Sequence, residues 1–414
     1  MPLGIYVSVP FCRTKCSYCN FASDVFSRAV FERYVDRVCQ DVESAAATAE
    51  RMGGTFETAI DSIYLGGGTP TVLESQQLER IFAAISQSFC LQSDTEITVE
   101  CAPGTLTPSV VENLLRRGVN RVSLGVQSFV DQEAAAVGRQ HKRAIVMAEI
   151  ERLREMGIDN INVDLIAGLP HQKAASWRTS LESLLEAGVP HASVYMLEVD
   201  EDSRLGRELI AGGSKYHAHF VPDEDLTADL YEMACDKLNA AGVEQYEISN
   251  FARAGCESRH NLKYWTRQPY FGFGVDAHSM LRAANDGFQR DSDAKLDAIR
   301  FSTSDQLEEY VGGSQLIRRE VSARAALEEE FFLGLRLNAG VDLGRLRQQY
   351  DEAHWRPEHL GLLQDVPAAA SDAVNAGLLE RRDERLRLTA RGRLLSNEVF
   401  AAIVEAGGEK VSGR

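Results

Sequence analysis

Short apolar runs alternate with segments of helical periodicity through the first half of the chain. The apolar runs are rich in Val, Ile and Leu, as strands buried on both faces tend to be. They cover residues 4–11, 59–68, 95–104, 120–129, 159–168 and 191–199. Between them, apolar residues recur at helical spacing in 75–89, 107–118, 144–157 and 180–188. This alternation predicts repeated βα units around a parallel sheet, and therefore an α/β fold.

Polar residues and glycines gather near the end of each predicted strand. They are Cys12, Gly66 to Gly68, Glu100, Gln127, Asp164 and Glu198. One such residue by itself could simply cap the next helix. In parallel α/β folds, however, the ligand site forms at the carboxyl edge of the sheet. Six consecutive strands that each carry such a group therefore predict one site at that edge.

The pattern changes after the sixth strand. Residues 244–281 are rich in aromatic residues and glycine, and the polar stretch 284–310 predicts a connector. Residues 322–340 predict an amphipathic helix that ends at Gly340. The tail, 377–404, predicts a two-stranded wing with a turn at "RRDE", followed by a helix. The expected units are a core barrel over 1–235, a barrel extension over 236–310, and a smaller winged-helix-like α+β domain over 311–414.

The chain is acidic. Its 414 residues include 44 Lys and Arg against 61 Asp and Glu, which gives a net charge of −17. A negative balance of this size disfavours a general binder of nucleic acid or of anionic membranes. The chain opens without a basic and apolar leader, and it holds no apolar run of membrane-spanning length. We therefore expect a cytoplasmic protein with no nucleic-acid partner.

Three of the eight cysteines form a C-x3-C-x2-C cluster directly after the first predicted strand. They are Cys12, Cys16 and Cys19. In the cytoplasm thiols stay reduced, so the cluster predicts metal binding and not a disulfide. Three thiolates on a [4Fe–4S] cubane leave one iron open. Zinc with a distant fourth ligand is the alternative, which the spacing alone leaves open. The position within a βα series favours the iron–sulfur cluster.

The cysteine pattern resembles the signature of the radical S-adenosylmethionine superfamily, which has an aromatic residue where Tyr18 stands. "GGGTPT", "VECAPGTLT", "SLGVQSF", "GRQH" and "NVDLIAGLPHQ" are similar, in order, to motifs of its HemN-like branch, the anaerobic coproporphyrinogen III oxidases and their relatives. The resemblance implies a partial (β/α)6 TIM-like barrel and S-adenosylmethionine on the open iron. It implies that S-adenosylmethionine contacts Tyr6, Tyr18, Gly67, Gly68, Thr69, Glu100, Gln127, Arg139 and Asp164. The alternatives are a tight turn at the glycines and satisfied buried carboxylates.

The sequence departs from the oxidases of this branch at two points. Phe21 stands where they have a further cysteine, and the first strand begins near Gly4, without their N-terminal extension. The hexad "HNLKYW", 260–265, instead resembles a hallmark of the sister group of heme chaperones. The resemblance implies that His260 binds heme iron, that Tyr264 and Trp265 pack on the porphyrin, and that a hydrogen bond from Asn261 orients the histidine. A satisfied core histidine is the alternative.

Two functions follow from the resemblance. The first is a heme chaperone that binds heme, a [4Fe–4S] cluster and S-adenosylmethionine, and transfers heme to an acceptor protein. The alternative is an oxygen-independent coproporphyrinogen III oxidase of porphyrin biosynthesis. A radical enzyme with another substrate is a weaker alternative. Phe21 and "HNLKYW" favour the chaperone, without oxidase turnover. Its implied partners are heme, an electron donor to the cluster, and an acceptor, with membrane-associated respiratory components as candidates.

Overall fold

The computed structural model describes residues 1–284, 296–351 and 370–407. Its main element is a twelve-stranded sheet with the order β12-β11-β10-β9-β1-β2-β3-β4-β5-β6-β8-β7. The strands from β9 to β6 in this order run parallel to one another. The first six are β1 (Leu3–Val9), β2 (Ala59–Gly67), β3 (Cys90–Cys101), β4 (Arg121–Gln127), β5 (Asn160–Ala167) and β6 (His191–Met196). The α/β prediction is confirmed, and each of the six predicted strands is present.

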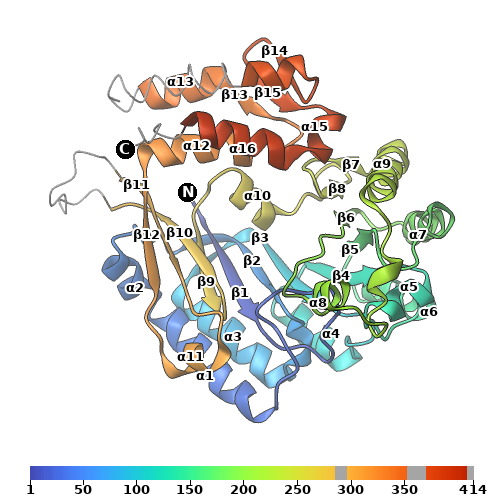
Figure 1. The fold of residues 1–414 in the computed structure, drawn as a ribbon. Coiled ribbons are helices and arrows are strands. Elements are labelled where there is room, and N and C mark those ends of the chain that lie inside the picture. The colour runs from blue at the N-terminus through green and yellow to red at the C-terminus, as the bar shows by residue number, and fades with distance from the viewer. Residues whose placement is uncertain (285–295, 352–369, 408–414) are drawn as a thin grey trace.

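Helices connect these strands and cover the outer face of the curved sheet (Figure 1). They are α1 (Ala29–Glu43), α2 (Ala45–Met52), α3 (Ser75–Ser88), α4 (Pro108–Arg116), α5 (Asp131–Ala136), α6 (Arg143–Glu155), α7 (Ala174–Ala187), α8 (Arg204–Ala211) and α9 (Glu224–Ala240). The four predicted helical segments correspond to α3, α4, α6 and α7. The partial (β/α)6 barrel is therefore as expected.

The two faces of the parallel strands differ in chemistry. In β1, Leu3, Ile5 and Val7 are fully buried in the main hydrophobic core. Because side chains alternate between the two faces of a strand, Tyr6 and Ser8 lie on the opposite, inner face. The apolar outer face packs against the helices, while the inner face of the barrel is largely polar. This division leaves polar side chains available to a ligand inside the barrel.

Further strands extend the sheet at both edges. β8 (Asn250–Ala252) and β7 (Glu244–Gln245) lie beyond β6, and β9 (Tyr270–Gly274), β10 (His278–Arg282), β11 (Leu296–Ser302) and β12 (Ile317–Ser322) lie beyond β1. The prediction of a connector over 284–310 is wrong for the part that the structure describes. β11 pairs with both β10 and β12 and is followed by α11 (Leu307–Gly312), while 285–295 lie outside the described residues. Ala298, Ile299 and Phe301 are buried, so packing defines this strand.

The C-terminal part has a second, smaller core. It contains α12 (Ala323–Gly334), β13 (Val341–Asp342), α13 (Leu343–Asp351), β14 (Leu379–Arg382), β15 (Arg385–Leu388), α15 (Ala390–Leu394) and α16 (Ser396–Gly407). Leu327 and Phe331 of α12 pack there with Leu386 of the wing and Ile403 of α16. The predicted wing, its turn and the following helix are all present. The large sheet ends at Ser322, past the boundary expected at residue 310.

Helix α12 ends earlier than predicted, at Gly334 and not at Gly340. Past its end the backbone bonds to the barrel. The amide of Ile248 donates to the carbonyl of Arg336 (3.1 Å), and the amide of Asn338 donates to the carbonyl of Tyr246 (2.9 Å). These tertiary bonds draw the chain out of the helix, a constraint that local periodicity does not record.

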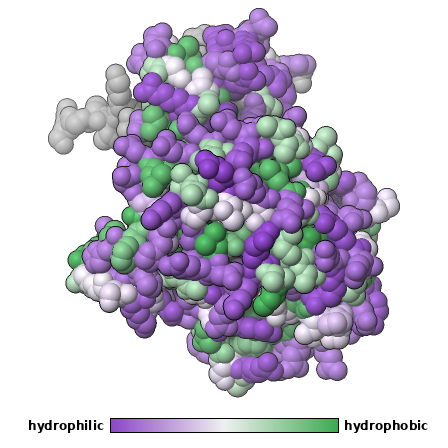
Figure 2. All heavy atoms as spheres, turned by 90° about the vertical axis from the view of Figure 1, so that its right-hand side faces the viewer, coloured by the Kyte–Doolittle hydropathy of each residue, from purple (hydrophilic) through white to green (hydrophobic). Residues whose placement is uncertain are grey.

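The face that carries α5 to α9 is covered mainly by hydrophilic residues, with hydrophobic ones scattered among them (Figure 2). This agrees with the excess of acidic residues in the sequence. Within the described ranges, none of the helices has the length and apolar character needed to cross a bilayer.

Candidate functional site

A cavity of about 550 Å³ lies at the carboxyl ends of the parallel strands. Its lining includes a residue from near the end of each of the first six strands: Cys12, Gly67, Glu100, Gln127, Asp164 and Glu198. The strand ends therefore line one cavity, which is where the sequence predicts a site. Gly68, Thr69, Tyr18 and Arg139 line the same cavity. Tyr6 does not, because its ring lies deeper in the barrel, beside that of Tyr64 (centroids 6.1 Å apart).

The loop after β1 carries the three clustered cysteines, and all three line the cavity. The Lys15 ammonium holds the loop by donating to the carbonyls of Phe21 (3.0 Å) and Ser23 (2.6 Å). Burial raises the pKa of the Cys12 thiol, although the hydroxyls of Ser23 and Thr69 oppose this shift. Bound iron would overcome that preference, because a coordinating thiol is deprotonated by the metal.

Among the described residues, no three Cys, His, Asp or Glu side chains converge on a single metal position. A mononuclear zinc site would require such convergence. In a cubane cluster each thiolate binds a different iron, so the three sulfurs need only face one space. Three cysteines along one cavity wall therefore fit the cluster better than zinc.

Glycines line the cavity where β2 ends, next to the cysteine loop. Gly67 has a φ of 93°, which a residue with a side chain rarely adopts. A Cβ at Gly68 would lie 2.8 Å from the carbonyl oxygens of Val9 and Phe11 and 3.1 Å from Cys12 Sγ. The absence of side chains keeps the backbone of this segment within reach of a ligand bound beside the cysteines.

Gln127 and Arg139 form a polar wall across the ends of β4 and α5. Gln127 has a φ of 69°, and such strain in a residue with a side chain is concentrated at ligand sites. The Arg139 guanidinium donates to the Tyr18 hydroxyl at 3.3 Å. Gly125 makes room for both, because a Cβ there would lie 3.1 Å from each side chain.

Two carboxylates complete the cavity wall. Burial raises the pKa of Glu100 to about 7, against hydrogen bonds from Tyr64 and the Gly67 backbone. The Tyr64 hydroxyl donates to Glu100 at 2.7 Å. Burial also raises the pKa of Asp164, which accepts hydrogen bonds from Asn162 (2.7 Å) and Ser123 (3.2 Å). Hydrogen bonds therefore hold both carboxyl groups in place at the cavity wall.

The sequence matches the Radical SAM superfamily over residues 6–184 and the HemN C-terminal domain over 321–395. It is 34% identical to the heme chaperone HemW of Bacillus subtilis over 403 residues, which covers 96% of this chain and 98% of that protein. This chain belongs to the HemW family of radical SAM proteins. It is also 31% identical, over 82% of its length and 74% of the relative's, to mitochondrial radical S-adenosyl methionine domain-containing protein 1 of Bos taurus.

The fold is shared with the coproporphyrinogen III oxidase HemN of Escherichia coli. The TM-score is 0.79 at 22% sequence identity, over 97% of this chain and 90% of that chain. Radical SAM membership implies a [4Fe–4S] cluster and S-adenosylmethionine. The cavity fits both, because three cysteines face it beside a glycine backbone, with carboxylates and Arg139 on the remaining walls.

The HemW-like hexad lies in helix α10 (Arg259–Trp265), beneath the cavity. His260 is 1% exposed, and its two ring nitrogens lie 3.0 Å from Ser62 Oγ and 2.9 Å from the Tyr264 hydroxyl. Burial and the nearby Lys263 lower the pKa of His260 to about 3, so the imidazole is neutral. In this state His260 is a satisfied core histidine.

Asn261 is the hexad residue that lines the cavity. The expectation that it orients His260 is wrong for this structure, since Ser62 and Tyr264 occupy both ring nitrogens. Trp265 lies away from the cavity, with the Arg336 guanidinium 4.2 Å from its ring centroid. The side chains expected to contact heme therefore lie behind the cavity floor, packed against the rest of the protein.

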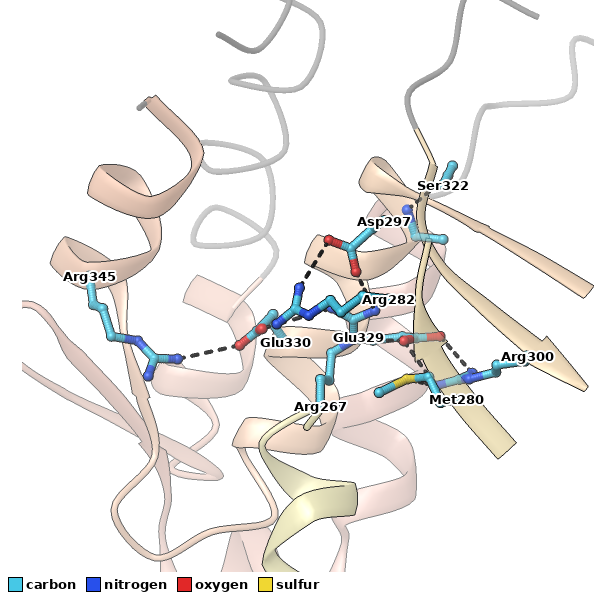
Figure 3. Close-up of polar contacts among 10 residues, drawn as sticks. Arg267, Met280, Arg282, Asp297, Arg300, Ser322, Glu329, Glu330 and Arg345 are labelled. Atoms are coloured by element: carbon cyan, nitrogen blue, oxygen red, sulfur yellow. Dashed lines mark hydrogen bonds and ion pairs between the residues drawn. The ribbon is translucent and has the colours of Figure 1, made fainter. Parts of the chain in front are cut away.

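Arg267, two residues after α10, ties this helix to the C-terminal part (Figure 3). It has a φ of 49° and is 3% exposed. Its guanidinium contacts Glu329 of α12 at 2.8 Å and Asp297 of β11 at 3.1 Å. Arg300 contacts Glu329 as well, at 2.7 Å. The end of α10 is thus fixed by a buried network of charges.

One group of cavity residues, which lie below the strand ends, is absent from the predicted site. They are Arg121, Ser123, Asn162, Ser193 and Tyr195. A signal for them exists, because they occupy every second position along β4, β5 and β6, on the same face as the strand-end groups. Following that period down each strand from its end would have identified them.

Proposed function

We propose that this protein is a heme chaperone, which binds heme and transfers it to an acceptor protein. The similarity to the heme chaperone HemW of Bacillus subtilis supports this most strongly, because it extends over 96% of the chain and 98% of the relative. This chain contains both the cysteine loop and the "HNLKYW" hexad, and a heme carrier with a cluster needs both a cluster site and a heme site.

In this proposal the cavity holds the [4Fe–4S] cluster and S-adenosylmethionine. Cys12, Cys16 and Cys19 provide the three thiolates. The Gly67 and Gly68 backbone, with Thr69, Tyr18 and Gln127, surrounds the cofactor, and Tyr6 supports it from below. Arg139 binds a carboxylate through its planar guanidinium, and Glu100 and Asp164 accept hydrogen bonds from hydroxyl or ammonium groups. Bound S-adenosylmethionine would supply the ligand that the three cysteines leave missing on the cluster.

His260 is the proposed ligand of heme iron, and ligation requires α10 to change. The imidazole has to give up its bond to the Tyr264 hydroxyl or to Ser62, and the side chain has to become accessible. In our proposal the structure represents a closed state of α10, in which both ring nitrogens of His260 are hydrogen-bonded within the protein. The heme-bound state is an open one, in which a ring nitrogen of His260 is free and Tyr264 and Trp265 pack on the porphyrin. The neutral imidazole suits iron ligation.

The partners in this proposal are heme, an electron donor to the cluster, and an acceptor protein, with membrane-associated respiratory components as candidates. We propose the cytoplasm as the location. The expected division into 1–235, 236–310 and 311–414 remains a proposal too. The second core between α12 and α16 supports a separate C-terminal unit.

The alternative function is oxidation of coproporphyrinogen III, which the fold shared with HemN favours. Phe21 speaks against it. This residue lines the cavity and is 66% exposed, at the position where the resemblance places a cysteine in the oxidases. A phenyl ring has neither the metal-binding nor the redox chemistry of a thiol.

The proposal is tested by titrating the anaerobically prepared protein with heme and following the Soret band. We expect saturable binding of one heme per chain by the wild type, and a weakened and shifted band in His260→Ala. His278→Ala is the matched control, because the side chain of this histidine is 68% exposed and does not line the cavity. Unchanged spectra in His260→Ala would exclude this residue as the ligand, and absence of binding by the wild type would exclude the function.

A further inference from the structure

Arg121 is a buried cation for which the described residues provide no direct hydrogen bond or ion pair, although its charge lowers the pKa of Glu100 and Asp164 from a distance. It stands at the start of β4, is 1% exposed and lines the cavity. Within residues 1–284, 296–351 and 370–407, no carboxylate lies within 4.0 Å of its guanidinium, and its Nε has no hydrogen-bond partner. Buried charges are normally paired, because an unpaired charge loses its hydration without compensation. The side chain therefore offers free donors to a ligand.

The polar residues one step further along β4 and β5 bind one another and not Arg121. Asn162 donates to Ser123 (2.8 Å) and to Asp164 (2.7 Å), and its own carbonyl oxygen lies 2.6 Å from His191 Nδ1. Asp164, the carboxylate of this network, is thus bound by Asn162 and Ser123. Arg121 lowers the pKa of this carboxyl group from a distance and makes no ion pair with it.

The same chain pairs its other deeply buried arginine fully. Arg267 is 3% exposed and contacts Glu329 and Asp297 within 3.1 Å (Figure 3). A buried guanidinium with a structural role is expected to be paired with carboxylates in this way. Arg121 has the same burial without the carboxylates, and it faces a cavity.

Arg121 lies deep in the barrel, far below the cysteines. The strand register aligns it with Thr98, Thr98 with Tyr64, and Tyr64 with Tyr6, whereas Cys12 comes after the end of β1. Asn261 of α10 lines the cavity too, and no hydrogen bond of its side chain amide is found among the described residues. An arginine and an amide therefore present unused donors to the lower part of one cavity.

We propose that Arg121 and Asn261 bind a carboxylate group of a ligand that reaches the lower part of the cavity. One guanidinium matches one carboxylate in charge and in planar, bidentate geometry. A phosphate dianion fits less well, since Glu100 and Asp164 share the cavity and would repel the second charge. The inference rests on the proposed function for its physiological ligand, which is then a propionate of heme. A free short-chain carboxylate is the other source of the same chemistry.

The first experiment tests the subsite without heme. Thermal unfolding of the full chain is followed in sodium propionate and in sodium chloride of equal ionic strength. We expect propionate to raise the unfolding midpoint beyond chloride in the wild type and in Arg207→Gln, a control whose side chain is 70% exposed. Arg121→Gln should lose that difference, and Arg121→Lys should keep part of it. No propionate effect in the wild type, or an equal effect in Arg121→Gln, would overturn the subsite.

Stability without ligand separates this role from a structural one. Arg121→Gln removes no direct hydrogen bond or ion pair, and the charge of Arg121 acts on Glu100 and Asp164 only from a distance, so the variant should unfold at the same temperature as the wild type or at a higher one. A variant that unfolds at lower temperature, or that fails to fold, would show that the cation stabilises the barrel and would overturn the proposal.

The second experiment identifies the source of the carboxylate. Heme and its dimethyl ester are titrated into the wild type and Arg121→Gln. The wild type should prefer heme by about tenfold or more, the usual size of a charge-assisted hydrogen bond, and the variant should lose this preference. Equal binding of heme and ester by the wild type would overturn the propionate assignment. If the wild type binds no heme, the proposed function fails and the propionate experiment alone decides the subsite.

Discussion

The imidazole of His260 and the hydroxyl of Tyr264 are joined by a 2.9 Å hydrogen bond within one turn of helix α10. The proposed heme ligand, His260, is thus hydrogen-bonded to Tyr264, a residue expected to pack on the porphyrin. Their bond holds the hexad in the closed state, with the second ring nitrogen against Ser62. Heme binding by this hexad competes with that bond, and the competition can be measured.

Removal of the Tyr264 hydroxyl should therefore favour heme binding. Tyr264→Phe keeps the aromatic ring and frees one nitrogen of His260, so we expect heme affinity to rise roughly fivefold, the equivalent of one neutral hydrogen bond. The measurement is a heme titration followed at the Soret band. A Tyr264→Phe variant that binds heme as poorly as His260→Ala would contradict this competition.

The cluster should depend on the three cysteines of the loop after β1 and not on the exposed Cys90. Replacement of Cys12, Cys16 or Cys19 by Ala should each abolish the cluster, because a cubane held by two thiolates loses a protein ligand it cannot replace. Iron and acid-labile sulfide per chain, measured after anaerobic reconstitution, report the loss. Cys90→Ala, at an exposed position, is the control and should retain both. Retention of full iron content in any of the three variants would remove that cysteine from the ligand set.

Glu100 should make stability fall as the pH rises. Its pKa is raised by burial from 4.5 to about 7 in the folded protein, so the unfolded chain releases this proton first. Between about pH 4.5 and pH 7 the folded state binds more protons than the unfolded state, and the free energy of unfolding declines through this window.

Glu100→Gln removes this dependence. We expect the variant to gain stability over the wild type as the pH rises through that window, with the gain complete at pH 8 and absent below pH 4. Chemical denaturation at a series of pH values checks this, with exposed Glu112→Gln as the control for loss of one charge. Parallel stability curves for the wild type and Glu100→Gln would show that Glu100 is not held in its protonated form.

Arg267 should matter far more for stability than its outer neighbour Arg345. Arg267→Ala leaves the buried Glu329 and the half-buried Asp297 with one cation fewer, and we expect a loss of about 3 kcal/mol in the free energy of unfolding. Arg345 also contacts a member of this network, Glu330, but its side chain is 68% exposed. Arg345→Ala should cost under about 0.5 kcal/mol. Equal effects of the two changes in urea denaturation would contradict a structural role for the Arg267 network.

The parallel half of the fold could be predicted from sequence because each βα unit carries a local pattern. The runs that became β1 to β6 were apolar enough to mark strands, and the polar residues at their ends marked the cavity. The strand β11 could not be found in this way. Leu296–Ser302 is a strand because it pairs with β10 and β12. This pairing is a tertiary contact, and it leaves little pattern in the local sequence.

The sequence predicted the residues at the rim of the cavity but not those deep inside it. Residues such as Cys12 and Glu100 stand out at the ends of strands, whereas Arg121 begins a strand and has no motif of its own. The closed state of His260 was equally hidden. A hexad in the sequence indicates which residues act together, but only the packing against Ser62 shows that the histidine is occupied.

The central claim is that this protein carries heme and does not oxidise porphyrinogen. One anaerobic preparation with an intact cluster tests it, first by heme titration and then by incubation with coproporphyrinogen III, S-adenosylmethionine and a reductant. We predict saturable heme binding that weakens in His260→Ala, and no formation of protoporphyrinogen IX. Turnover to protoporphyrinogen IX, with heme binding absent or indifferent to His260, would contradict the claim.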